Sequence, residues 1–199
     1  MKKIFITQRL EKIGKHQELR DNLDLRFSFF FQKLNMLPII VPNNLRNLKE
    51  LIKKIKPNGI LLSPGGNPLK RDARFNTETF LIKHSKKNKI PILGICRGAQ
   101  ALNLFCGGRI IKIKNHVRKR HKLFGKIISL KNNLTSYCFH EYGIKKNTLG
   151  KNLIPLAFSE DGSIECFKHL NGKIMGIMWH PERKKNFRSF ELKIIKKFF

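Results

Sequence analysis

Short apolar runs alternate with amphipathic segments through the first half of the chain. The runs typical of buried strands lie at residues 3–7, 38–41, 59–63 and 90–95. The segments expected to be helices lie at residues 17–35, 45–55, 77–87 and 99–105. Strands that alternate with helices predict right-handed βαβ units and a parallel sheet covered on both faces. We therefore predict an α/β three-layer sandwich that binds ligands at the carboxyl ends of its strands.

The second half of the chain is built from shorter pieces. Strand-like pieces lie at residues 107–113, 126–130, 164–169 and 173–178. Turn signals such as Asn171-Gly172 separate them, so we expect antiparallel strands that extend the sheet, and then a last helix at residues 187–199. A chain of 199 residues suits one well-buried domain, which we expect to span residues 1–199.

The first candidate for chemistry is Cys96, which lies where the fourth predicted strand meets the following helix. Gly94 and Gly98 flank it and allow the sharp bend of a nucleophile elbow, with Cys in place of Ser. The helix N-terminus behind the sulfur favours the thiolate. A lone Cys is more often a small buried hydrophobe, but the two glycines favour the nucleophile.

A nucleophile needs a base, and His180 follows the predicted strand at residues 173–178. Glu182 comes two residues later. An imidazole takes the thiol proton and later activates water, while a carboxylate orients the ring. Taken alone, a His before a Pro at a strand end is more often a turn residue.

Three ordered motifs resemble the class I glutamine amidotransferase superfamily: G-x-C-x-G at residues 94–98, W-H-P-E at residues 179–182, and a glycine turn at residues 62–68. The resemblance implies a flavodoxin-like fold in which the Cys attacks a γ-glutamyl amide and forms a glutamyl thioester that water hydrolyses. It implies that Cys96 is the nucleophile, that His180 is general base and then acid, and that Glu182 orients His180.

The resemblance also implies an oxyanion hole, formed by the Arg97 amide and a backbone amide at Gly65 or Gly66. Removing one oxyanion donor typically costs about 10²–10³ in rate. Gln100 matches a residue that holds the glutamyl group in many members. From the residues alone, it is equally a polar side chain on the first turn of a helix.

Within the superfamily, the sequence looks most similar to the γ-glutamyl hydrolase branch. Arg97 follows the Cys as in that branch, and Phe139-His140 matches an element in which the His contacts substrate. Three positions depart from its pattern: Cys138 replaces a Ser, Tyr137 an Asn, and Phe75 the Asp of an R-D-x-x-E stretch that Arg74 and Glu78 otherwise fit.

Further matching segments are residues 6–10, the compact loop after Gly66, residues 116–121 and residues 140–143. Through them the sequence looks most similar to the small bacterial hydrolases that release CDP-amidate from γ-glutamyl-CDP-amidate during capsular polysaccharide phosphoramidate synthesis. Arg9, Arg118 and Arg120 would then bind the diphosphate, since guanidinium forks match phosphate oxygens. They are equally well explained as a solvated basic loop. A glutaminase subunit of an amidotransferase and a γ-glutamyl-γ-aminobutyrate hydrolase remain alternatives.

The net charge of +29 admits two interpretations. Clustered Lys and Arg would indicate a nucleic-acid-binding protein on this scaffold. However, the lysine pairs are spread along the whole chain, which favours a compositional bias, and a positive field would still help to capture a phosphorylated substrate. We therefore expect a small, nucleotide-linked γ-glutamyl substrate rather than nucleic acid and keep nucleic-acid binding as the non-enzyme alternative.

Four cysteines without paired spacing predict free thiols, no metal site and no cofactor. No apolar run suits a signal peptide or a membrane span, so we expect a cytoplasmic protein without a membrane partner.

Overall fold

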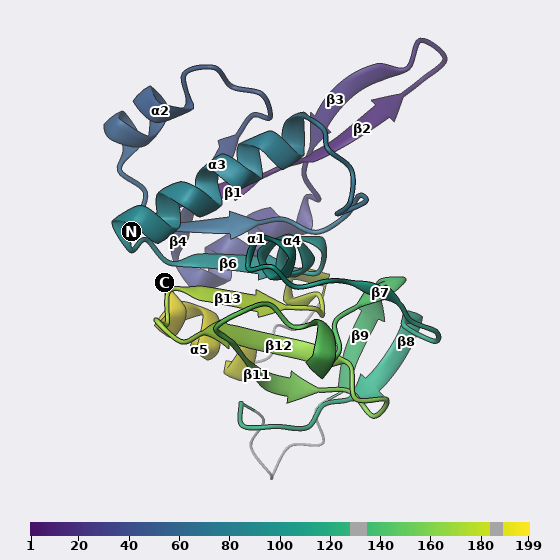
Figure 1. Cartoon of the computed structure of the whole chain (residues 1–199). Coiled ribbons are helices and arrows are strands. Elements are labelled where there is room, and N and C mark those ends of the chain that lie inside the picture. Colours follow the sequence, from purple (N-terminus) through teal and green to yellow (C-terminus); the bar gives the residue numbers. More distant parts are fainter. Residues whose placement is uncertain (128–134, 184–188) are drawn as a thin grey trace. The chain divides into compact units, whose positions relative to one another are not determined.

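The computed structural model describes residues 1–127, 135–183 and 189–199 (Figure 1). It divides into two compact units: unit 1 comprises residues 1–92 and 181–199, and unit 2 comprises residues 93–180. The single domain expected over residues 1–199 stays a prediction. Among the described residues, every helix is too short or too polar to cross a bilayer.

Unit 1 is built around three parallel strands, in the order β5-β1-β4. They are β1 (Lys2–Thr7), β4 (Met36–Val41) and β5 (Gly59–Leu62). The helices of this unit are α1 (Arg26–Leu34), α2 (Leu48–Ile55), α3 (Ala73–Asn88) and α5 (Ser189–Phe198), with a short 3₁₀ turn η2 (Pro181–Arg183). The predicted alternation of strands and helices is confirmed here.

The core of unit 1 is apolar and aromatic. Ile4, Phe5 and Ile6 of β1 are fully buried. Phe27, Phe30 and Phe31 of α1 are also buried and pack against one another, with Phe27 and Phe30 edge to face at 6.2 Å between ring centroids. The α1 helix packs on β4 and α5. This phenylalanine cluster therefore serves packing.

The predicted helix over residues 17–35 is wrong in its first half. Instead, β2 (Arg9–Ile13) and β3 (Glu18–Asn22) form an antiparallel hairpin, and only α1 is helical. Leu19 is exposed rather than facing a core. Cross-strand pairing of β3 with β2 explains the difference, because tertiary partners override a weak local helix pattern.

Unit 2 places four strands in the order β11-β12-β13-β6. They are β6 (Ile92–Ile95), β11 (Leu153–Phe158), β12 (Ile164–His169) and β13 (Ile174–Ile177). The β12 strand runs antiparallel to both β11 and β13, which confirms the antiparallel strands predicted at residues 164–169 and 173–178. Helix α4 (Arg97–Phe105) packs on β13.

Two small strand pairs complete unit 2 (Figure 1). One is the antiparallel hairpin of β8 (Val117–Lys122) and β9 (Thr135–Phe139), and the other pairs β7 (Ile111–Lys112) with β10 (Tyr142–Gly143). A short 3₁₀ turn, η1 (Lys146–Thr148), follows β10. The predicted α/β class, with parallel strands joined by antiparallel ones, is confirmed.

Three predicted elements differ from the structure in their bounds or lie partly outside the described residues. The strand expected at residues 107–113 is reduced to β7. Of the strand expected at residues 126–130, residues 126 and 127 form a turn and the rest lies outside the described residues. The last helix is described from residue 189, and residues 184–188 lie outside the described part.

Candidate active site

Cys96 lies at a sharp bend between β6 and α4, as the sequence predicts. Its backbone has φ 50° and ψ −105°, a combination that side chains other than Gly rarely adopt. The Cys96 amide donates to the Ile177 carbonyl at 2.7 Å, and the Cys96 carbonyl accepts from the Gln100 amide at 3.0 Å. Cys96 is thus the N-cap residue of α4, and its hydrogen bond to Ile177 links it to β13, the strand that leads to His180.

Gly94 is required by the close approach of β6 to α4. A Cβ on Gly94 would lie 2.4 Å from the carbonyl carbon and oxygen of Gly98 and 2.5 Å from the Ala99 nitrogen. These are backbone atoms of the first helical turn, which have no freedom to rotate away. The glycines around Cys96 therefore allow the helix to begin directly behind the sulfur, where its N-terminal amides favour a negative charge.

His180 is buried at 4% exposure and follows β13. Its ring meets the Phe139 ring edge to face, with 5.6 Å between centroids and 89° between planes. Phe139 thereby limits how the imidazole can rotate. Cys96 and His180 belong to unit 2, whereas Glu182 belongs to unit 1, where it is buried in η2. The role of Glu182 beside His180 stays a prediction.

Two residues expected to bind substrate share one backbone carbonyl. The Gln100 side-chain amide donates to the Tyr142 carbonyl at 2.6 Å, and His140 Nδ1 lies 3.1 Å from the same oxygen. Burial, aided by the neighbouring His116 and His180, lowers the pKa of His140 to about 3, so this imidazole is neutral at physiological pH. Both side chains are buried and held in place by the fold.

Arg118 and Arg120 lie on β8, and both are exposed. Arg118 has φ 55° at an irregularity in the pairing of β8 with β9. The basic segment is therefore a strand rather than the loop considered above. Arg97, whose amide is expected in the oxyanion hole, is buried in the first turn of α4.

In unit 1, Gly65 and Gly66 form the glycine turn, with φ of 85° and 81°. Arg74, which is 2% exposed, supports it by donating to the Gly65 carbonyl at 2.7 Å and to the Ser63 carbonyl at 2.6 Å. Its Nε also binds Glu78 Oε1 at 2.8 Å. The Arg and Glu of the R-D-x-x-E stretch therefore hold the glycine turn.

Arg9 lies over this turn, since a Cβ on Gly65 would meet its guanidinium Nε at 2.6 Å. Arg9 also pairs with Glu11. A pocket in the same unit is lined by Arg9, Ser63, Pro64, Gly65 and Arg183, together with Leu23, Asp24 and Phe27. Arg183 is not among the site residues predicted from the sequence, because it lies far from Arg9 along the chain and belongs to none of the three motifs.

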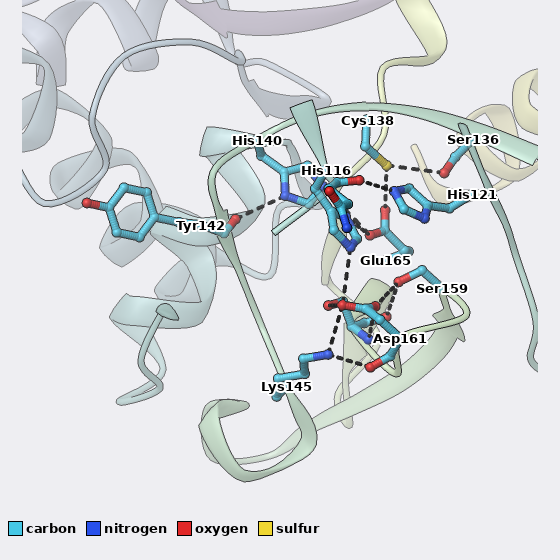
Figure 2. Close-up of polar contacts among 12 residues, drawn as sticks. His116, His121, Ser136, Cys138, His140, Tyr142, Lys145, Ser159, Asp161 and Glu165 are labelled. Carbon is cyan, nitrogen blue, oxygen red and sulfur yellow. Dashed lines mark hydrogen bonds and ion pairs between the residues drawn. The ribbon is translucent and has the colours of Figure 1, made fainter. Parts of the chain in front are cut away.

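A group of buried side chains next to His140 is not indicated by any sequence motif. His116, Cys138 and Glu165 gather around it in unit 2 (Figure 2). Burial raises the pKa of Glu165 to about 8 and raises the pKa of the Cys138 thiol. All four cysteines of the chain are described, and each is a free thiol, as predicted.

Comparison with known proteins places these observations in context. Residues 30–199 match the family model of glutamine amidotransferase class-I. The chain is 34% identical to the gamma-glutamyl-CDP-amidate hydrolase of Campylobacter jejuni subsp. jejuni over 205 aligned positions, which cover 98% of this chain and 96% of that protein. It is 30% identical to one of the subunits of the glutamine-hydrolyzing GMP synthase of Methanococcus vannielii, over 73% of this chain and 75% of that one.

A solved structure agrees on the fold. A Thermoplasma acidophilum protein, described as a subunit of a GMP synthase, superposes with a TM-score of 0.72 at 23% identity, covering 100% of this chain and 92% of the other. At this identity the likeness concerns the α/β architecture alone.

Proposed function

Since the chain belongs to the glutamine amidotransferase class-I family and is a glutamine amidotransferase-like hydrolase, we propose that it cleaves a γ-glutamyl amide through Cys96. Cys96 attacks the γ-carbonyl carbon, the C–N bond breaks, and the amine leaves with a proton from His180. Water then attacks the glutamyl thioester with His180 as base, releasing glutamate and restoring the thiol. Glu182 orients His180 in this scheme.

The elbow at Cys96 carries this proposal. A non-glycine residue at φ 50° costs free energy and persists only where the surroundings enforce it. Here the Gly94–Gly98 approach and the hydrogen bond to Ile177 enforce it. The result is a thiol at a helix N-terminus, which is the environment that makes a cysteine nucleophilic. The Arg97 amide at the start of the same helix is the proposed oxyanion donor, together with Gly65 or Gly66.

We further propose that the substrate is γ-glutamyl-CDP-amidate and that the amine released is CDP-amidate. The Campylobacter jejuni relative, matched over 98% of this chain, carries that activity in its name. Arg9 and Arg183 line the pocket at the glycine turn, and Arg118 and Arg120 are exposed on β8. Guanidinium groups bind phosphate oxygens in pairs, so these arginines suit a diphosphate. Gln100 and Phe139 are the proposed contacts of the glutamyl group.

Glutamate release from a substrate panel tests the proposal. The panel contains glutamine, γ-glutamyl-γ-aminobutyrate and γ-glutamyl-CDP-amidate. We expect turnover of the nucleotide conjugate and its loss in Cys96→Ala. Cys106→Ala is the matched control, because Cys106 is a thiol at the opposite end of the same helix, and we expect it to keep activity. Equal glutamate release by Cys96→Ala and the unaltered protein would refute the nucleophile.

A second candidate is a glutaminase subunit that passes ammonia to a synthase. The relative in Methanococcus vannielii favours it, since its name describes a subunit of a glutamine-hydrolyzing GMP synthase. This candidate predicts weak glutamine hydrolysis by the isolated chain and a rise when a synthase partner is added. Strong hydrolysis of the nucleotide conjugate by the chain alone would exclude it.

A further inference from the structure

Four buried side chains of unit 2 present metal-binding atoms to one another. They are His116, Cys138, His140 and Glu165, and one ligand atom of each lies within 4.8 Å of all the others. All four are at most 4% exposed. His116 directly precedes β8, Cys138 lies on β9, His140 directly follows β9, and Glu165 is the second residue of β12. Figure 2 shows them converging from these segments.

The imidazoles turn their lone pairs toward Glu165. His140 uses Nδ1 for the Tyr142 carbonyl, so the neutral ring carries its proton there and leaves Nε2 bare, 3.7 Å from Glu165 Oε1. His116 Nε2 lies 3.3 Å from Asp161 Oδ2, which favours a proton on Nε2 and leaves Nδ1 bare, 3.6 Å from the same Glu165 oxygen. Ring nitrogens that bind metals are held in this way by a carbonyl or a carboxylate on the other nitrogen.

The distances between these atoms are too long for hydrogen bonds. Among the described residues, His116 Nδ1, His140 Nε2 and Glu165 Oε1 have no hydrogen-bond partner. Two lone pairs and a carboxylate oxygen facing one another in a buried site repel, and a single proton on Glu165 satisfies at most one of them. A cation at the centre of the group would bind all of these atoms, whereas without one the buried polar atoms lack partners and cost free energy.

A tetrahedral zinc ion fits the spacing. Zinc binds nitrogen and oxygen at about 2.0–2.2 Å and sulfur at about 2.3 Å, so neighbouring ligands in a tetrahedron lie roughly 3.3–3.6 Å apart. Glu165 Oε1 lies 3.6 Å from His116 Nδ1 and 3.7 Å from His140 Nε2, and Glu165 Oε2 lies 3.6 Å from Cys138 Sγ. Glu165 is therefore within about 0.4 Å of tetrahedral spacing from each of the other three residues, and all four ligand atoms lie within 4.8 Å of one another.

We propose that His116, Cys138, His140 and Glu165 form a structural site for a divalent ion of the zinc class. The thiolate and the imidazoles select zinc over magnesium or calcium, which prefer oxygen ligands. The carboxylate and the thiolate balance the two charges of the ion. Because four protein atoms fill the tetrahedron, the ion has no open position for substrate, as in structural zinc sites. The ion would tie the β8–β9 hairpin to β12.

This assignment gives His140 a ligand role in place of the substrate contact expected from the sequence. It also gives the ion an indirect influence on catalysis. Phe139 lies between Cys138 and His140 in the chain, and its ring rests against His180. Fixing both neighbours of Phe139 fixes the ring that limits rotation of His180, so removing the ion should lower activity without removing any group that touches substrate.

Cobalt titration of metal-stripped protein tests the site. The Cys96→Ala background excludes binding by Cys96 with His180. In that background we expect one cobalt ion per chain, with the near-ultraviolet thiolate charge-transfer band and the strong visible bands of four-coordinate cobalt. Cys138→Ser should lose the charge-transfer band, while Cys166→Ser should keep it. Cys166 is the matched control because it is a fully buried thiol next to Glu165 on β12.

Two further measurements test the site even if the Cys138→Ser protein misfolds. Asp161→Asn changes the group behind His116 without touching a ligand atom and should weaken cobalt binding by about 10–100-fold; Lys145→Met, which removes another partner of Asp161, is its control. Zinc at roughly 100 times its Kd should raise Tm by about 5–10 °C in the Cys96→Ala protein. Absence of the charge-transfer band in Cys96→Ala itself, or its persistence in folded Cys138→Ser, overturns the proposal.

Discussion

Replacing Gly94 with Ala should disturb the elbow directly. The added Cβ would lie 2.4 Å from two atoms of Gly98 and 2.5 Å from Ala99 N, all of them backbone. Ordinary carbon contacts are longer by about 1 Å, so β6 and the first turn of α4 must move apart. Overpacking of a core costs about 1–3 kcal/mol of stability. Because the clashing atoms here belong to the backbone and cannot rotate away, we expect this substitution to cost about 3 kcal/mol or more. A loss of about 3 kcal/mol lowers Tm by roughly 6–12 °C in a protein of this size.

The same displacement should reduce activity, because Cys96 lies two residues beyond the clash. A shift of about 1 Å at a reacting group costs about 100-fold in rate. The assay combines thermal unfolding by circular dichroism with glutamate release. Gly172→Ala is the control, since Gly172 has φ 74° but an added Cβ there would have nothing within 4 Å. That variant should lose only about 1–2 kcal/mol and keep its activity. A Gly94→Ala protein with unchanged Tm and rate would refute the reasoning.

Further predictions concern the glycine turn, the basic strand, the whole-chain charge and the proposed ion. Arg74→Met removes the ion-pair partner of buried Glu78 and should destabilise by about 3–5 kcal/mol in denaturant unfolding. The double variant with Glu78→Leu should recover only the part due to the unpaired carboxylate, because the Ser63 and Gly65 carbonyls still lack their donor. Arg120→Ala should raise KM for γ-glutamyl-CDP-amidate and leave turnover of γ-glutamyl-γ-aminobutyrate unaffected. Lys119 is also an exposed cation but lies on the other face of β8, so Lys119→Ala should change neither. Nucleic-acid filter binding at moderate salt should show no retention, and tight, steeply salt-dependent retention would revive the nucleic-acid hypothesis. Chelation of the folded protein should lower both Tm and kcat, with both restored by zinc, and a chelated protein unchanged in both would contradict an ion that supports Phe139.

Local patterns were sufficient to predict much of the fold and the bend at Cys96. The strands β1, β5 and β6 contain short apolar runs whose neighbours along the chain already mark their ends. At Cys96, the spacing of two glycines between a strand and a helix encodes the close approach seen at Gly94. In each case, the information lies within a few residues of the feature.

Features that depend on distant partners were missed. Leu19 of β3 and Leu23, which follows the strand, have the i, i+4 spacing of a helix, and only the pairing with β2 makes residues 18–22 a strand. The β8 strand consists mostly of charged residues and has no apolar alternation to reveal it. The cluster of His116, Cys138, His140 and Glu165 draws on segments about fifty residues apart, which no spacing motif connects. Arg183 reaches the pocket of Arg9 only through folding of unit 1.

Trapping the glutamyl enzyme tests the nucleophile most directly. The protein is mixed with γ-glutamyl-CDP-amidate, quenched in acid, digested and examined by mass spectrometry. We predict a glutamyl group on the peptide that contains Cys96, absent from the peptides of Cys106, Cys138 and Cys166, and formed as fast as glutamate is released. Full glutamate release without any adduct on Cys96, together with undiminished turnover by Cys96→Ala, would contradict the account.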